Sequence, residues 1–168
     1  MAIDVSVSRA IERPAEAVAG YLADPAHDPE WIGGLVEVQV PDAPLAVGAR
    51  VERVARFMGR RIEYVLEVTA LEPGRRLAMR SVRAPLPMEV TYAVEPAGAG
   101  CTVTLRVAGG PGGLARLAHP LMARQVRRNL AGDLERLAAR VGAQAGAIPG
   151  APGRPSPPPR ARTRPPRS

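Results

Sequence analysis

The order of the expected elements constrains this chain more than any other feature of its sequence. Apolar and polar residues alternate in six successive runs between about residues 35 and 107, and alternation with a period of two is typical of half-buried β-strands. A similar run occupies residues 3–8, and residues 114–141 repeat apolar positions every three to four residues, as an amphipathic helix does. A long meandering sheet with one long helix to cover it is expected to curl around that helix and to enclose a space.

Short segments connect these runs. Pro14 suits the first turn of a helix over residues 15–23, and the Pro- and acid-rich residues 24–31 predict turns with one short helical turn. Glycines mark the connections between the later runs, with a tight hairpin expected at Gly59. Strands joined by short turns are antiparallel neighbours. We therefore expect an α+β fold in which a curved antiparallel sheet of about seven strands wraps round a long C-terminal helix, with two short helices after the first strand.

The long helix carries one continuous apolar stripe. Its members are Leu114, Leu117, Leu121, Met122, Val126, Leu130, Leu134, Leu137 and Val141. Pro120 is expected either to kink this helix or to mark its true start. The glycine-rich residues 109–113 lack the Lys-Ser/Thr of a phosphate loop, so we reject nucleotide binding.

Charge is distributed unevenly along the chain. The net charge is +7, but residues 149–168 hold five arginines and no acids, whereas residues 1–148 hold 18 arginines against 16 acids. The nearly neutral part argues against nucleic-acid binding by the folded domain. Eight of the last twenty residues are proline, so we expect a folded domain over residues 1–146 and a disordered Pro/Arg-rich tail over 147–168. We favour a solvated tail over one that attracts anionic membranes or RNA.

Several classes of site and location are not expected. The chain has one cysteine, Cys101, and two separated histidines, which predict no disulfide, no metal site and no cofactor. The acids Asp24, Asp28 and Glu30 lie near His27, but we interpret them as a solvated loop. The first residues lack the basic start and continuous apolar stretch that a signal peptide needs, and no run approaches roughly 20 apolar residues. We expect a cytoplasmic protein without stable membrane insertion, and the exclusive use of arginine among basic residues indicates a GC-rich, bacterial genome. The sequence carries no signal of oligomeric state.

Four passages resemble a known superfamily. They are residues 11–18 (IERPAEAV), 22–31 (LADPAHDPEW), 68–77 (VTALEPGRRL) and 100–105 (GCTVTL). Together they are similar to START-like (SRPBCC) proteins of the polyketide cyclase/dehydrase and lipid-transport group, over about residues 2–142. The resemblance implies a helix-grip fold (START/Bet v1-like) and a cavity under the long helix. Members bind lipids, sterols, polyketides or plant hormones there, and a minority are cyclases or aromatases.

Nine residues are candidates for contacts with a ligand. They are Trp31, Arg53, Tyr64, Leu66, Met79, Met88, Tyr92, Leu121 and Gln125. Trp31 is either a lid at the pocket mouth or a core anchor, and we favour the anchor. Met79 and Met88 suit an adaptable pocket wall or ordinary core filling. The hydroxyls of Tyr64 and Tyr92 are equally suited to a polar group of the ligand or to a partner within the protein.

The polar candidates have competing interpretations. An inward Arg53 would bind a carboxylate or enolate oxygen, but the alternation around it is ambiguous and we favour a solvated arginine at a strand edge. Gln125 and Asn129 share a helix face, which we expect to be solvent-exposed. We expect His27 to be exposed and His119 to lie near the cavity entrance, and neither has the partner that a catalytic base needs.

These observations leave three functions open. The first is a non-enzymatic protein that binds or carries a hydrophobic small molecule, such as a lipid or a polyketide-like compound. The second is a polyketide cyclase or aromatase in which a tyrosine or arginine stabilises an enolate. The third is an interaction module whose cavity is filled with side chains. We favour the first.

Overall fold

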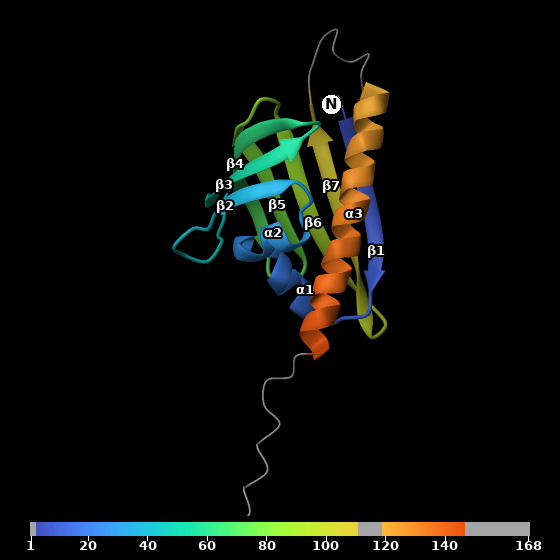
Figure 1. The fold of residues 1–168 in the computed structure, drawn as a ribbon. Coiled ribbons are helices and arrows are strands. Elements are labelled where there is room, and N and C mark those ends of the chain that lie inside the picture. Colours follow the sequence, from blue (N-terminus) through green and yellow to red (C-terminus); the bar gives the residue numbers. More distant parts are fainter. Residues whose placement is uncertain (1–2, 111–118, 147–168) are drawn as a thin grey trace, which may run out of the picture.

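Residues 3–110 and 119–146 are described in a computed structural model of the chain, and they contain one antiparallel sheet. Its strands are β1 (Ile3–Ile11), β2 (Leu35–Gln39), β3 (Arg50–Phe57), β4 (Arg60–Glu72), β5 (Arg76–Arg83), β6 (Met88–Ala97) and β7 (Gly100–Gly109). They form a seven-stranded sheet in the order β1-β7-β6-β5-β4-β3-β2. Strands from β2 to β7 follow the chain order, while β1 crosses to pair with β7. The sheet curls into a half-barrel (Figure 1), as the alternation predicts.

Short helical pieces lie between β1 and β2. They are α1 (Ala15–Leu22), the 3₁₀ turn η1 (Pro25–His27) and α2 (Asp28–Trp31). Pro14 precedes the first turn of α1, and the Asp24 carboxylate accepts a hydrogen bond of 2.9 Å from the Ala26 N–H at the start of η1. The two predicted helices are therefore present, with the second divided into η1 and α2.

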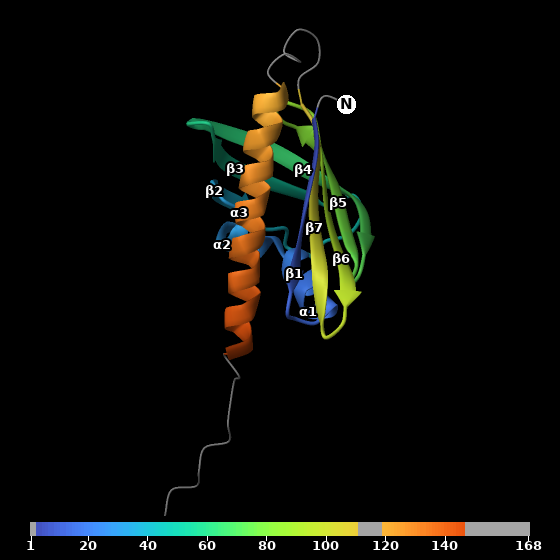
Figure 2. The same cartoon turned by 90° about the vertical axis from the view of Figure 1, so that its right-hand side faces the viewer.

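The long helix α3 (His119–Gly146) lies across the concave side of the sheet (Figure 2). It packs chiefly along β1, and its buried residues Leu130, Leu134, Leu137 and Val141 join the core formed by the strands. The predicted stripe is thus confirmed over this part of the helix. Leu114 and Leu117, like the tail over residues 147–168, lie outside the described residues.

Strand β2 is less regular than the alternation of Val36, Val38 and Val40 predicts. Its register against β3 shifts between Leu35 and Glu37, and the strand ends at Gln39. Val36 and Val40 are consequently exposed. The bulge turns part of the apolar face outward, which sequence periodicity alone does not reveal.

The β3–β4 hairpin is a two-residue turn. Phe57 pairs with Arg60, and both intervening residues, Met58 (φ 48°) and Gly59 (φ 77°), have positive φ. Positive φ at both central positions is the geometry of the tight turns that match the twist of paired strands. The hairpin predicted at Gly59 is confirmed, and the turn fixes Met58 at its tip.

Candidate functional site

A cavity of about 280 Å³ lies between the concave face of the sheet and α3. Leu66, Val90 and Leu105 line it from the strands, and Met122, Val126 and Leu130 line it from α3. At one end it is bordered by Phe57 and by the β5–β6 loop (residues 84–87), and at the other by Trp31, Arg53, Tyr64, Tyr92 and Asp133. The walls are therefore apolar. The buried polar side chains gather at one end, and the exposed Arg56 borders the other.

Six of the nine candidate residues line this cavity. They are Trp31, Arg53, Tyr64, Leu66, Met88 and Tyr92. Met79 is buried in the core and does not border the cavity, in keeping with core filling. Leu121 is 68% exposed and lies outside the cavity, because it points away from the face that Met122 and Val126 present to the sheet. Its assignment to the cavity wall is wrong.

Gln125 lies beside the cavity and does not line it. It is half-buried, and its side-chain amide donates a 2.9 Å hydrogen bond to the Asn129 side-chain oxygen. Asn129 borders the cavity. The two residues share a helix face as their spacing predicts, but this face is partly covered and not fully solvated.

Arg53 is a buried cation, and the expectation of a solvated arginine at a strand edge is wrong. Its side chain is 4% exposed, and Nη2 lies 2.5 Å from Oδ2 of Asp28, which is 1% exposed. The Nη1 group donates to the Tyr92 hydroxyl at 3.4 Å. Asp28 is thus not part of a solvated acidic loop, because α2 turns it inward onto β3.

Three buried polar atoms near this ion pair have no hydrogen-bond partner among the described residues. They are Arg53 Nε, Asp28 Oδ1 and Trp31 Nε1. Trp31 is almost fully buried, and its ring meets the Tyr92 ring edge to face at a centroid distance of 5.4 Å. Trp31 is therefore a core anchor that also lines the cavity. Leaving buried donors unpaired is unfavourable, so this end of the cavity is suited to a ligand that offers an oxygen acceptor.

Burial sets the protonation behaviour of these groups. It raises the pKa of Asp28 to about 6, since the loss of solvent outweighs the attraction of Arg53. Burial also raises the pKa of Tyr92 to about 12 and raises that of Tyr64, so both hydroxyls remain protonated at neutral pH. Burial alone would lower the pKa of Arg53, but Tyr92 and Asp28 outweigh it and raise that pKa. Arg53 therefore stays charged.

A second buried carboxylate joins α2 to α3. Asp133 accepts a 2.8 Å hydrogen bond from the Gly33 N–H and forms an ion pair with Arg136. Arg136 in turn donates to the Trp31 carbonyl oxygen at 2.9 Å. Burial raises the pKa of Asp133, against the opposing effects of Gly33 and Arg136. This contact holds Trp31 at the cavity. Sequence analysis missed it, because Asp133 and Gly33 are 100 residues apart.

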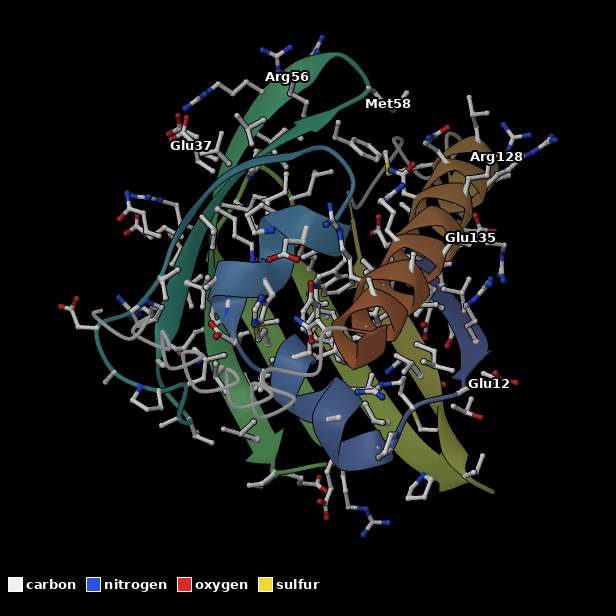
Figure 3. All side chains as sticks on the ribbon, turned by 60° about the horizontal axis from the view of Figure 1, so that its bottom comes forward. Glu12, Glu37, Arg56, Met58, Arg128 and Glu135 are labelled. Atoms are coloured by element: carbon white, nitrogen blue, oxygen red, sulfur yellow. The ribbon has the colours of Figure 1, made fainter. Side chains whose placement is uncertain are left out.

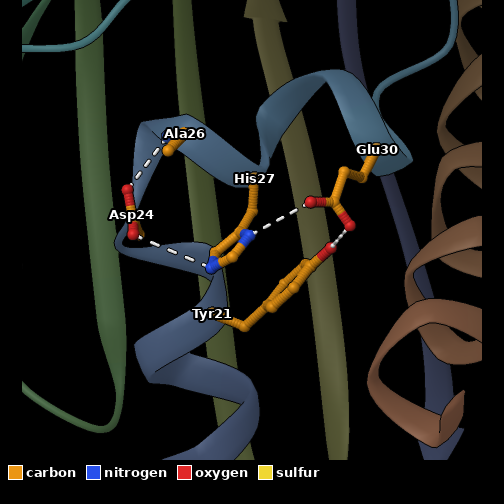
Figure 4. A network of polar contacts seen from close by, with 5 residues as sticks. All are labelled: Tyr21, Asp24, Ala26, His27 and Glu30. Atoms are coloured by element: carbon orange, nitrogen blue, oxygen red, sulfur yellow. Dashed lines mark hydrogen bonds and ion pairs between the residues drawn. The ribbon is translucent and has the colours of Figure 1, made fainter. Parts of the chain in front are cut away.

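A polar network lies among the short helices (Figure 4). His27 is half-buried, stacks on the Tyr21 ring at a centroid distance of 4.1 Å, and lies 3.3 Å from Glu30 through Nδ1 and 3.7 Å from Asp24 through Nε2. The Tyr21 hydroxyl donates to Glu30 at 2.9 Å. None of these residues lines the cavity, so we assign the network to the structure of α1, η1 and α2. The side chain of His119 lies outside the described residues.

A second hollow, of about 390 Å³, lies between α1 and the β4–β5 turn. Trp31 and Arg53, which carry unpaired polar atoms, border the first cavity and not this hollow, although Tyr92 borders both. We therefore place the candidate site in the smaller cavity under α3.

We expect Asp28 to titrate near pH 6 in the folded protein. Its folded pKa lies above the ordinary value of 3.8, so the folded state binds more protons than the unfolded state between about pH 4 and pH 6. The contribution of Asp28 to the free energy of unfolding therefore falls as pH rises through that range, by on the order of 2–3 kcal/mol, and is constant above it. Carbon-13 NMR of the carboxyl carbon measures this pKa directly.

Asp28→Asn is the control for this titration. The pKa values of Asp4, Glu30 and Glu67 are lowered by their hydrogen-bond partners, so these groups favour the folded state increasingly as pH rises from acid. These groups contribute equally to the parent protein and to Asp28→Asn, so their contributions cancel when the free energies of unfolding of the two proteins are subtracted. A difference that does not change between pH 4 and pH 7 would contradict the prediction.

Comparison with protein families identifies this chain over most of its length. The model of the family described as polyketide cyclase / dehydrase and lipid transport matches residues 2–142. Comparison with curated proteins gives no match. Within residues 3–110 and 119–146, no helix has the length and apolar character needed to cross a membrane.

Solved structures agree with the family match at the level of the fold. The protein TTHA0849 from Thermus thermophilus has a TM-score of 0.74 at 22% identity, covering 84% of this chain and 99% of that one. The ZhuI aromatase/cyclase from Streptomyces sp. R1128 has a TM-score of 0.71 at 18% identity, covering 88% and 98%. A START superfamily protein from Mycobacterium smegmatis has a TM-score of 0.67 at 16% identity, covering 84% and 98%.

The resemblance of the sequence, the half-barrel closed by α3 and these matches lead to one assignment. The START-like helix-grip fold is confirmed. Family and fold are consistent both with binding of a hydrophobic ligand and with polyketide cyclase or aromatase activity. The chain belongs to the polyketide cyclase/dehydrase and lipid transport family.

Proposed function

We propose that this protein binds a hydrophobic small molecule carrying one anionic or carbonyl oxygen. The observation that carries the proposal is the pairing of an apolar cavity with Arg53, a buried cation at one end whose Nε has no partner among the described residues. Burial of apolar surface supplies affinity, at about 25 cal/mol per Å² before the costs of association. Arg53 sets the orientation.

The ion pair with Asp28 does not cancel this role. Asp28 uses one carboxylate oxygen for Nη2 of Arg53, which leaves Nε of the same guanidinium unpaired among the described residues. A guanidinium has five N–H donors and can hold a carboxylate on one side and a ligand oxygen on another. Asp28 positions Arg53, whose side chain borders the cavity.

A matched pair of probes tests the proposal. Decanoate and decanol have the same alkyl chain and differ at the head group, so isothermal titration calorimetry with both separates the apolar from the polar contribution. We expect decanoate to bind at least tenfold more tightly than decanol. Equal affinity for the two probes would contradict the role of Arg53 in orienting the ligand. If neither probe binds, the cavity is not a binding site for such ligands.

We expect Val126→Phe to lower the affinity for decanoate at least tenfold with little loss of stability. Val126 is half-buried and faces the cavity from α3, so a larger side chain occupies space that the ligand needs. The matched control is Val82→Phe, because Val82 is 42% exposed and does not border the cavity. Calorimetry gives the affinity and thermal unfolding gives the stability. Unchanged binding by Val126→Phe would place the ligand elsewhere.

The second candidate is a cyclase or aromatase acting on a bound polyketide. It is favoured by the cluster of Arg53 with Tyr64 and Tyr92 at one end of the cavity, since a cation and hydroxyl donors stabilise an enolate oxygen. The ZhuI aromatase/cyclase has the same fold. Tyr64→Phe distinguishes the two functions, as does Arg53→Ala at a temperature where unfolding measurements show that it is folded. Turnover would be abolished in an enzyme, whereas a carrier would show only a shift in affinity.

Native mass spectrometry of the purified protein, compared with its denatured mass, tests both functions at once. A hydrophobic adduct lost on denaturation would identify the class of ligand. The single tryptophan, Trp31, lines the cavity, so its fluorescence provides an independent signal of binding in solution.

A further inference from the structure

Three exposed apolar side chains lie on segments that border one end of the cavity. Met58 at the tip of the β3–β4 turn is 67% exposed, Leu86 in the β5–β6 loop is 38% exposed, and Leu121 on α3 is 68% exposed. Each is adjacent in sequence to residues that line the cavity, namely Phe57, Pro85 and Met122. We call Met58, Leu86 and Leu121 the mouth rim. Single exposed apolar residues are ordinary, but three from separate elements around one opening form a patch.

Arginines without a carboxylate partner accompany the mouth rim. Arg60 follows the β3–β4 turn, and Arg124 and Arg128 share the face of α3 that carries Leu121. All three are exposed, and none forms an ion pair with a described residue. By contrast, the neighbouring Arg61 and Arg83 lie near Glu37 and Glu52. Figure 3 shows Arg56 and Met58 of the hairpin and Arg128 of α3 at the same end of the molecule.

Acidic residues are missing from the segments that form this end. Residues 53–62, 80–88 and 119–128 contain no aspartate or glutamate. These segments therefore carry only positive charge, which Glu37 and Glu52 neutralise at Arg61 and Arg83 but not at Arg60, Arg124 and Arg128. This local excess contrasts with residues 1–148 as a whole, which carry 18 arginines and 16 acids.

We infer that the mouth rim docks on the surface of an anionic lipid bilayer. Apolar side chains flanked by arginines match the two layers of a membrane interface, with apolar tips entering the acyl boundary and guanidinium groups binding headgroup phosphates. The three apolar residues project from three separate elements, which suits a fluid surface better than the fixed pockets of a protein partner. A docked rim places the cavity opening against the acyl chains, so an apolar ligand enters without crossing water.

Sedimentation of the full-length protein with lipid vesicles tests this inference. We expect binding to vesicles made of equal parts phosphatidylcholine and phosphatidylglycerol, little binding to phosphatidylcholine alone, and release at high salt. Absence of binding to the anionic vesicles at low salt would overturn the proposal and would leave an acidic protein as the occupant of this surface.

Two sets of variants locate the contact. Arg60→Gln, Arg124→Gln and Arg128→Gln combined are expected to weaken partition on the order of a hundredfold. The control combines Arg9→Gln, Arg75→Gln and Arg140→Gln, which removes the same charge from exposed positions on β1, the β4–β5 turn and the later part of α3. Equal losses in both sets would indicate a nonspecific charge effect. No loss in either set would assign the affinity elsewhere, for example to the arginines of residues 149–168. Either result overturns the proposal.

Insertion of the rim has a separate signal. A fluorophore sensitive to polarity, attached to Leu121→Cys, is expected to shift to the blue on anionic vesicles, whereas the same fluorophore on Val47→Cys is not. Val47 is 66% exposed in the β2–β3 connection, and the native Cys101 is buried and protected from labelling. No shift at Leu121→Cys would contradict insertion.

The docking can be tested separately from ligand binding, although its proposed benefit, entry of the ligand from the bilayer, rests on the proposed function. The three rim arginines do not line the cavity, so their variant is expected to bind decanoate normally in the absence of vesicles. If the arginine variant loses vesicle binding and still binds decanoate, the docking surface is supported. If the parent protein does not bind decanoate, only the ligand-binding proposal is contradicted.

Discussion

Arg53→Met is expected to lower the free energy of unfolding by about 3–5 kcal/mol at pH 8, because it leaves the Asp28 carboxylate buried without its partner. Asp28 is 1% exposed, and one of its oxygens already has no partner among the described residues of the parent protein. Methionine retains most of the apolar length of arginine, so the loss reports the missing charge more than a missing volume. Chemical denaturation measures it.

The loss depends on pH in a defined direction. Without Arg53 the pKa of Asp28 rises above the value of about 6 that it has in the parent protein, because the attraction that opposed burial is gone. The carboxyl is then neutral below that pKa and carries no penalty as a buried charge. Arg53→Met is therefore expected to be less destabilising at pH 5 than at pH 8.

Two further variants separate the ion pair from other effects. Arg50→Met removes an arginine from the same strand, but Arg50 is exposed and its ion pair with Glu67 at 3.2 Å is worth at most about 1 kcal/mol. The double variant Arg53→Met with Asp28→Leu is expected to recover most of the lost stability, since no isolated charge remains. A double variant as unstable as Arg53→Met alone would contradict the electrostatic explanation. If it folds and fails to prefer decanoate over decanol, Arg53 also has the proposed role in binding.

The second large effect concerns the attachment of α3. Leu137→Ala is expected to lower the free energy of unfolding by about 2–5 kcal/mol, because Leu137 is fully buried in the core shared by α3 and the sheet. The removed methyl groups lose their apolar contacts, and the surrounding strands cannot close the space fully. Thermal or chemical unfolding at neutral pH gives the value.

Leu121→Ala is the matched control for this prediction. Both leucines belong to the same apolar stripe in the sequence, but Leu121 is exposed in the structure. Its truncation is expected to change stability by about 0.5 kcal/mol or less. Similar losses for the two variants would mean that Leu121 is covered in solution.

Much of the fold is predictable from the sequence, because the evidence for it is local. Alternating residues define the strands, Gly59 defines the tight hairpin, and the stripe from Leu130 to Val141 defines the buried face of α3. The resemblance of residues 2–142 to a known superfamily then supplies the arrangement of these elements. Family model and solved structures confirm it.

The polar end of the cavity was less predictable, because its interactions join distant segments. Asp28 and Arg53 are 25 residues apart, and each has neighbours typical of a solvated position. Only the tertiary fold, which brings Asp28 of α2 within 2.5 Å of Arg53 of β3, removes both from water together. Leu121 illustrates the opposite error, since helical periodicity marks an apolar position without showing whether another element covers it.

The pairing of β1 with β7 separates the synthesis of one strand from its incorporation into the sheet. Ile3 pairs with Gly109 and Ile11 with Cys101, so the first of the seven strands to leave the ribosome has no partner until the last of them has been synthesised. Contacts between residues so far apart in sequence slow folding, because the entropy of closing the intervening loop is lost before the pairing is gained. The other strands form successive hairpins and can assemble in order. We therefore expect β1 to be the last strand to join the sheet, and nascent chains arrested before β7 to leave it accessible to proteases.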